Sequence, residues 1–200
     1  MAYTKPTLAD LKQSLADRHD GGDIPTDSST LSLWIRLFNR GVEYCIRKLG
    51  IVKSTSLTTS GGTVALPDDF VKINRVYDAN DNLISLITKE ISVKAGTSED
   101  VYWITGDFVN GFYFNTPDDE TYTIYYTYRP SPMSADTDVC QFQDEEAITA
   151  YAYGMLRKSE SDPFEDANQA LGEVDARLSE IASQYNTNDK PLGFTLDANA

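Results

Sequence analysis

Two segments near the N-terminus, residues 7–18 and 30–49, place hydrophobic residues at the spacing of an α-helix. The second segment has the longer hydrophobic stripe, which consists of Leu31, Trp34, Ile35, Phe38, Val42, Cys45, Ile46 and Leu49. Ser28 or Ser29 is the expected N-cap of this helix, and Gly50 stands where a helix C-terminus favours glycine. The pattern predicts two amphipathic helices, each of which buries one side.

Between residues 51 and 130 the pattern changes to short runs rich in Thr, Val, Ile and Tyr, which is typical of β-strands. Residues 51–66 surround Gly61-Gly62 and predict a hairpin, and residues 88–100 predict a short helix or a loop. Further strands are expected at residues 70–77, 83–87, 101–104, 111–114 and 121–128. Short strands at this spacing favour a small antiparallel sandwich or barrel.

Helical spacing returns at residues 143–158 and again at residues 162–185, where Asp162-Pro163 is a typical helix start. We therefore predict an α+β protein, in which a helical bundle of about four helices has an inserted small antiparallel β sandwich or barrel domain. The predicted division is a discontinuous helical bundle at residues 1–50 and 131–185, a β domain at residues 51–130 and an extended C-terminal tail at residues 186–200.

The charge of the chain is unevenly distributed. Its 200 residues include 17 Lys and Arg and 31 Asp and Glu, which gives a formal net charge of −14. Residues 1–50 have seven basic and six acidic residues, a net charge of +1, whereas residues 51–200 have ten and 25, a net charge of −15. This balance argues against a basic nucleic-acid surface, because affinity for phosphate comes mainly from Lys and Arg. The acidic excess fits either solubility or a surface that must not adhere to nucleic acid.

The predicted helix at residues 30–49 has a mostly basic side opposite its hydrophobic stripe. Arg36, Arg40 and Arg47 fall on this side and are candidate subunit-contact residues. The alternative interpretation is a helix face that contacts only solvent.

Residue types that perform catalysis or bind metals are scarce in the sequence. His19 is the only histidine, and its polar, glycine-containing surroundings predict an exposed loop residue. Cys45 falls within the hydrophobic stripe and Cys140 precedes a helix, where a thiolate could be stabilised. One histidine and two distant cysteines do not form a zinc motif, and the sequence contains no Gly-x-Gly phosphate loop. We therefore predict no enzymatic activity, no cofactor and no metal site.

Aromatic residues are concentrated in the β region, where they must fill a core or contact a partner. They are Tyr102, Trp103, Phe112, Tyr113, Phe114, Tyr122, Tyr125, Tyr126 and Tyr128. A partner-binding surface is one interpretation, because Tyr and Trp are common in interface hot spots. No hydrophobic run approaches the roughly 18 residues that a membrane-spanning helix needs.

Four segments follow one another along the chain, and their order is more specific for a protein family than any one segment is. They are residues 66–71 (LPDDFV), 102–107 (YWITGD), 123–130 (TIYYTYRP) and 145–154 (EEAITAYAYG). Their order over residues 28–185 resembles the head–tail adaptor proteins of tailed bacteriophages, including the tail-tubular-protein-A-like members.

The resemblance implies a structural protein of the virion that is made in the host cytoplasm and located in the neck, at the head–tail junction. It implies a homo-oligomeric ring of about twelve subunits, whose partners are the portal protein and a downstream neck or tail protein. DNA is expected to pass through this ring without specific binding, and no membrane is involved. The alternative is a tail- or capsid-associated binding module whose aromatic β domain holds a host glycan or protein.

The resemblance also gives candidate roles to two further sets of residues. The C-terminal tail is expected to reach the portal, with Leu192 and Phe194 as apolar contacts. An acidic lumen would repel DNA phosphates, and its candidate residues are Asp68, Asp69, Asp118, Asp119 and Glu120.

Overall fold

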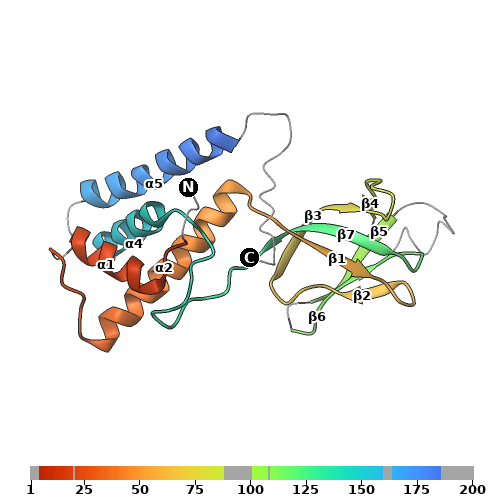
Figure 1. Cartoon of the computed structure of the whole chain (residues 1–200), viewed down its shortest axis with the longest axis horizontal. Helices are drawn as coiled ribbons and strands as arrows, with labels where there is room; N and C mark the ends of the chain where they lie inside the picture. Colours follow the sequence, from red (N-terminus) through yellow and green to blue (C-terminus); the bar gives the residue numbers. More distant parts are fainter. Residues whose placement is uncertain (1–4, 20, 88–100, 108, 160–163, 186–200) are drawn as a thin grey trace. The chain divides into compact units, whose positions relative to one another are not determined.

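The computed structural model describes residues 5–19, 21–87, 101–107, 109–159 and 164–185. These residues form four helices and seven strands, so the predicted α+β class is confirmed. The described part of residues 1–50 and 130–192 forms one compact unit, which contains all the helices. The described part of residues 51–129 forms the second, which contains all the strands (Figure 1).

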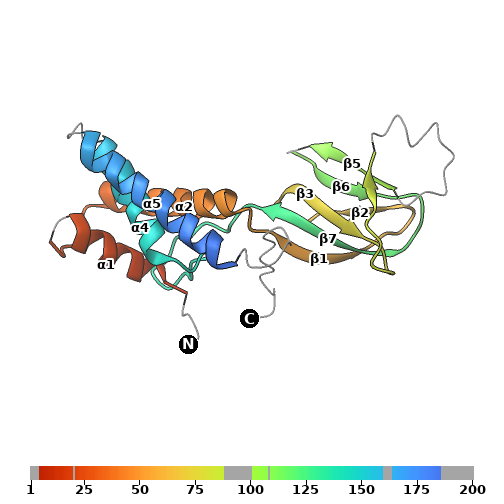
Figure 2. The ribbon, with the colours of Figure 1, turned by 90° about the horizontal axis from the view of Figure 1, so that it is seen from above.

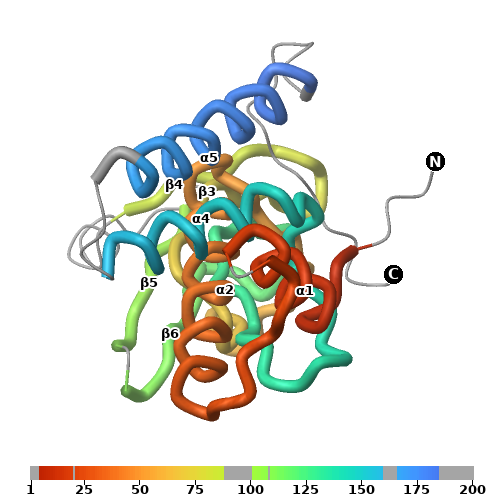
Figure 3. Tube along the Cα trace, turned by 90° about the vertical axis from the view of Figure 1, so that its left-hand side faces the viewer, coloured from red at the N-terminus to blue at the C-terminus, as the bar shows by residue number. Residues whose placement is uncertain are grey.

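The helical unit is organised around one helix. Its members are α1 (Leu8–His19), α2 (Ser28–Leu49), α4 (Glu145–Ser159) and α5 (Phe164–Tyr185). Helix α4 packs extensively against each of the other three, and Figure 3 shows it between α5 on one side and α1 and α2 on the other. The largest fully buried side chains of this unit are Leu8, Leu11, Leu15, Trp34, Phe38, Ile46, Ile148 and Leu178.

The caps of α2 fix where this helix begins and ends. The predicted N-cap at Ser28 or Ser29 is wrong, because the carboxylate of Asp27 accepts the backbone N–H of Thr30 at 2.8 Å and caps the helix. Hydrogen bonds from Ser29 and Thr30 favour the charged carboxylate and lower the pKa of Asp27 to about 2. The predicted C-cap is confirmed: Gly50 has a φ of +65°, and its N–H bonds to the carbonyl of Arg47.

The β unit contains two sheets. The first has the order β1 (Lys53–Thr58), β7 (Thr121–Tyr128), β3 (Phe70–Tyr77), and the second has the order β2 (Thr63–Ala65), β6 (Gly111–Asn115), β5 (Val101–Asp107), β4 (Ser85–Leu86). Figure 2 shows β5 and β6 in one layer and β1, β7 and β3 in another. Aromatic side chains connect the sheets, since the rings of Phe114 and Tyr122 lie 5.3 Å apart and those of Phe70 and Phe112 lie 5.6 Å apart. No closed barrel is found among the described strands.

Two turns of the β unit reverse the chain, but the strands beyond them pair elsewhere. Ser60 bridges Thr63 across Gly61-Gly62, yet β1 pairs with β7 and β2 pairs with β6 in the other sheet, so the predicted hairpin of residues 51–66 is wrong. Leu83 bridges Tyr77 of β3 in the antiparallel sense, yet β4 pairs in parallel with β5, so the sheets are not entirely antiparallel. A turn signal predicts a change of direction and leaves the partner strand undetermined. The predicted elements at 88–100, 162–163 and 186–200 lie outside the described residues.

The β5–β6 turn yields a stability prediction. We expect Gly106→Ala to lower the free energy of unfolding more than Gly111→Ala does. Both glycines have positive φ, +102° and +85°, so any Cβ adds backbone strain of about 1–2 kcal/mol. A Cβ at position 106 would also lie 2.1 Å from the carbonyl oxygen of Gly111, whereas one at position 111 would meet no atom within 4 Å. Urea unfolding followed by near-UV circular dichroism measures both losses, and equal losses would contradict this geometry.

Candidate functional site

The exposed side of α2 has two positive charges that lack ionic partners among the described residues. Trp34 and Phe38 are buried, whereas Arg36, Arg40 and Arg47 are exposed, as the predicted helical pattern requires. Arg47 forms an ion pair with Glu43 one turn earlier. Within the described part of the chain, neither Arg36 nor Arg40 forms an ion pair. Two guanidinium groups are therefore available to a carboxylate from outside the subunit.

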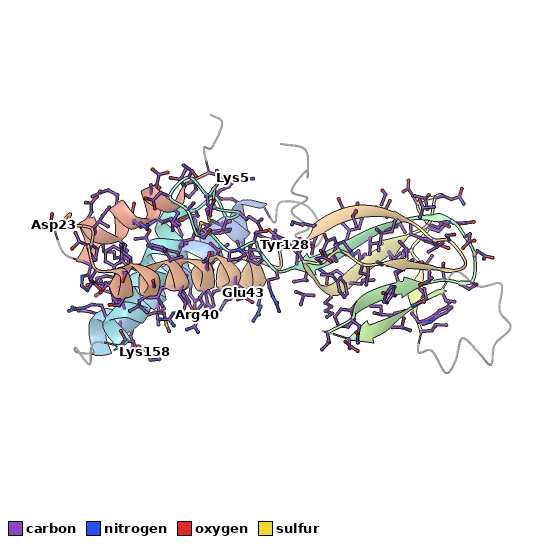
Figure 4. The ribbon with its side chains drawn as sticks, turned by 90° about the horizontal axis from the view of Figure 1, so that it is seen from below. Lys5, Asp23, Arg40, Glu43, Tyr128 and Lys158 are labelled. Atoms are coloured by element: carbon purple, nitrogen blue, oxygen red, sulfur yellow. The ribbon has the colours of Figure 1, made fainter. Side chains whose placement is uncertain are left out.

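A depression of about 480 Å³ lies beside these arginines. Its lining residues come from α2 and α4 and are Arg40, Glu43, Tyr44, Arg47, Lys48 and Tyr151. The rings of Tyr44 and Tyr151 stack with their centroids 5.2 Å apart, so two helices contribute to one aromatic surface. Arg40 and Glu43 lie along the same side of α2 (Figure 4). Charged groups surrounding an aromatic surface suit the binding of an acidic protein segment.

A hydrogen-bond network between α2 and α5 holds the depression in shape. The hydroxyl of Tyr44 donates to the carboxylate of Asp175 at 2.7 Å, and the Lys48 ammonium lies 3.3 Å from the same oxygen. The Asp175 carboxylate raises the pKa of Tyr44, and the Tyr44 hydroxyl lowers the pKa of Asp175. Sequence analysis did not identify Tyr44 and Lys48, although both lie within one turn of Arg47. Tyr151 could not have been found in this way, because it comes from another helix.

The candidate acidic residues have different surroundings in the β unit. The Asp69 carboxylate lies 2.6 Å from the Lys53 ammonium and accepts the hydroxyl of Tyr126 at 3.0 Å. The Asp119 carboxylate accepts the backbone N–H groups of Gly61 and Gly62, which lowers the pKa of Asp119. These two carboxylates therefore stabilise the fold of the unit.

The other acidic candidates, Asp68, Asp118 and Glu120, are exposed. Among the described residues their side chains have no hydrogen-bonding or ionic partner. Leu192 and Phe194, the candidate portal contacts, lie outside the described residues.

In the part of the chain that the structure describes, the chemically reactive residue types are not brought together in a catalytic arrangement. His19 is not a loop residue as predicted but the last residue of α1, and its ring lies edge-on to Tyr153 at 6.1 Å. Cys45 and Cys140 are both buried, and burial raises the pKa of Cys45 to about 12 and that of Cys140 to about 11. Helix proximity therefore does not produce a thiolate at Cys140. Within the described ranges no group of acidic residues, cysteines and histidines could hold a metal, and no helix there could span a membrane.

The geometry thus indicates a protein that binds other proteins, and a comparison with protein families decides which kind. The family model of the SU10 adaptor protein matches residues 6–193. The chain belongs to the SU10 adaptor protein family. A search of curated proteins found no match.

Membership in this family confirms the resemblance to phage head–tail adaptors that the sequence motifs indicated. The adaptor is a structural protein of a bacteriophage virion, and its role is to interact with other head and tail proteins. A structural family of this kind fits the lack of a catalytic arrangement described above.

The aromatic residues of the adaptor's β unit serve mainly as its core. Tyr102, Phe114, Tyr122, Tyr126 and Tyr128 are all buried. Among the described aromatic side chains of this unit, only Tyr113 is exposed, at 42%. This arrangement weakens the glycan-binding alternative, because a sugar platform requires exposed rings.

The buried cysteines yield a prediction about reactivity. A thiol reagent such as DTNB at mildly alkaline pH should leave both cysteines of the folded adaptor unmodified. Burial blocks access to the thiols, and their raised pKa values keep them protonated. In denaturant both cysteines should react, and a Cys140→Ala variant assigns the two signals. Rapid modification of Cys140 in the folded protein would show that this loop opens.

Proposed function

We propose that the adaptor forms a closed ring of about twelve subunits in the neck, between the portal protein and a downstream neck or tail protein. Genomic DNA passes through this ring without sequence-specific binding. The family match supports the adaptor role, and the observation that carries the ring is the basic side of α2, where Arg36 and Arg40 form no ion pair with the described residues. A closed ring needs heterologous contacts, in which one face of a subunit meets a different face of its neighbour.

The basic side of α2 has the properties of one such face. Arg36 and Arg40 are one helical turn apart, so their like charges disfavour the isolated helix by about 0.2–0.5 kcal/mol. Carboxylates from a neighbouring subunit would reverse the sign of this interaction, because guanidinium and carboxylate groups form strong paired hydrogen bonds. The net charge of −14 means that another copy of the chain has such carboxylates in excess. Arg47 lies on the same side, where its pairing with Glu43 leaves it a secondary role.

The two units divide the work in this proposal. The helices of residues 1–50 and 131–185 act as a bundle that makes the ring contacts, and the sheets of residues 51–130 act as an inserted sandwich. The C-terminal tail, with Leu192 and Phe194, contacts the portal, as the resemblance to head–tail adaptors suggests. Since Asp69 and Asp119 have partners inside the β unit, an acidic channel lining depends on the remaining candidates, Asp68, Asp118 and Glu120.

Copy number per particle tests the ring. Purified particles should contain about twelve copies of the adaptor, because each particle would have one closed ring of about twelve subunits. Quantitative mass spectrometry with isotope-labelled peptides gives this number, and the portal protein serves as the internal reference. Hundreds of copies would indicate a capsid or tube lattice, and absence from particles would refute a role in the virion.

A charge reversal tests the subunit contact. Arg40→Glu should reduce ring assembly and incorporation into particles, because it places a carboxylate against the neighbour's carboxylates. Lys158→Glu is the matched control, since Lys158 is also an exposed cation of the helical unit and does not line the depression. Circular dichroism should be the same for both variants and the unmodified chain. Normal assembly of Arg40→Glu, or an equal defect in both variants, argues against this interface.

A further inference from the structure

The outer face of the first sheet has a composition unlike that of the rest of the chain. On β7 the alternate residues Tyr122, Ile124, Tyr126 and Tyr128 are buried, so the residues between them face outward. The pairing register aligns Ser56 with Thr123 on one side of β7, and Arg75 with Tyr125 on the other. The outward residues of the three strands are Ser54, Ser56, Thr58, Val71, Lys72, Asn74, Arg75, Tyr77, Thr121, Thr123, Tyr125 and Thr127. We call this set the hydroxyl face.

The hydroxyl face contains no carboxylate. Its two charged residues, Lys72 and Arg75, are exposed, and neither forms an ion pair within the described ranges. This absence is informative in a chain with 31 acidic and 17 basic residues. The carboxylates next to these strands lie beyond their ends, at Asp69, Asp78 and Glu120. Asp69 pairs with Lys53, and Asp78 accepts backbone N–H groups of its own turn.

Irregular pairing of β3 places both cations on this face. The register of β3 against β7 shifts between Phe70 and Lys72 and again between Ile73 and Arg75. As a result every third residue of β3 is buried instead of every second, and the two residues between face outward. A regular strand would direct Lys72 and Arg75 to opposite sides of the sheet.

Side-chain contacts keep the hydroxyl face ordered. Asn74 donates to the hydroxyl of Thr127 at 3.2 Å, and the hydroxyls of Thr58 and Thr121 lie 2.9 Å apart. The rings of Tyr77 and Tyr125 meet edge to face at 5.8 Å. The surface is therefore rich in hydrogen-bond donors, and its charged side chains are both positive.

We propose that the hydroxyl face contacts the phosphate backbone of duplex DNA. Its polar residue types, Ser, Thr, Asn, Tyr, Lys and Arg, are those that donate hydrogen bonds to phosphate oxygens in protein–DNA complexes. The proposal rests on the proposed function, because it assigns one face of the β unit to the DNA that passes through the ring. Two cations per subunit give weak, salt-sensitive contacts that carry no sequence information. An acidic protein segment would fit the depression on α2 better than the hydroxyl face, because the arginines and stacked tyrosines of the depression form a pocket.

Photo-crosslinking in DNA-filled particles tests this assignment. Benzoylphenylalanine is introduced at Ser56 or at Asn74, which are exposed residues on two different strands of the hydroxyl face. Thr63 on β2 is the control, because it is exposed and belongs to the other sheet. We expect DNA-linked adaptor from the variants at positions 56 and 74. The variant at position 63 should give no DNA-linked adaptor. Crosslinks only to protein from both positions, or DNA crosslinks of equal yield from all three, would overturn the proposal.

The copy number of each variant separates failure of this proposal from failure of the ring. If particles contain about twelve copies but positions 56 and 74 yield no DNA crosslink, the hydroxyl face is wrong and the ring stands. If the copy number differs from that of a single ring, the proposed function fails whatever the crosslinks show.

A second measurement applies if a crosslinking variant does not enter particles. The full-length adaptor is titrated into a short fluorescent DNA duplex at several salt concentrations. Lys72→Gln/Arg75→Gln should lower the slope of log affinity against log salt by about two, because two phosphate contacts are lost. Lys5→Gln/Lys158→Gln removes the same charge from two positions of the helical unit and should leave the slope unchanged. Equal effects of the two double variants, or no DNA binding by the unmodified chain at low salt, would overturn the proposal.

Discussion

The close approach of the other helices to α4 is the constraint on which the helical unit depends. Small residues permit it: a Cβ at Gly154 would lie 3.1 Å from the side chain of Leu171 on α5, and one at Gly41 on α2 would lie 3.2 Å from the ring of Tyr151. Because Tyr151 is held against α2 in this way, its ring stacks on Tyr44 and forms part of the depression. The surface that we assign to a neighbouring subunit is thus a consequence of core packing, and larger residues at these glycines would displace it.

The sequence predicted the helices better than the sheets because helix signals are local. Hydrophobic spacing and Gly50 located α2 to within two residues, and only the choice among Asp27, Ser28 and Ser29 as N-cap was missed. Strand partners depend on contacts distant in sequence. The separation of β1 and β2 into different sheets, and the parallel pairing of β4, could not be inferred from their own residues. The register shifts of β3 also left no recognisable pattern in the sequence. Because these shifts decide which residues face outward, the hydroxyl face could not be predicted.

Of the candidate site residues, the arginines of α2 could be placed from the sequence, and the acidic residues could not. Counting charges treats every carboxylate as available to a partner. In the structure the Asp107 carboxylate accepts the backbone N–H groups of Val109 and Asn110 at 2.7 and 2.8 Å, and Asp78 bonds to its own turn in the same way. The Asp119 carboxylate accepts the backbone N–H groups of the turn at Gly61 and Gly62. These hydrogen bonds lower the pKa of each group and commit its charge to the local fold. Fewer carboxylates are therefore free to pair with a partner than the net charge suggests, whereas Arg36 and Arg40 form no ion pair among the described residues.

The basic side of α2 and the hydroxyl face differ as their proposed partners do, because a neighbouring subunit stays in place whereas DNA moves. A subunit contact must persist, and guanidinium groups beside a rigid aromatic surface give carboxylates a fixed and directional site. A DNA contact in a channel must break as the duplex advances, so strong or numerous cations would oppose movement. Hydroxyl groups satisfy phosphate oxygens without a large electrostatic attraction, and two cations per subunit keep each contact weak. In the proposed ring, repetition of this face would hold the duplex through many weak contacts at once, and the loss of any one of them would cost little.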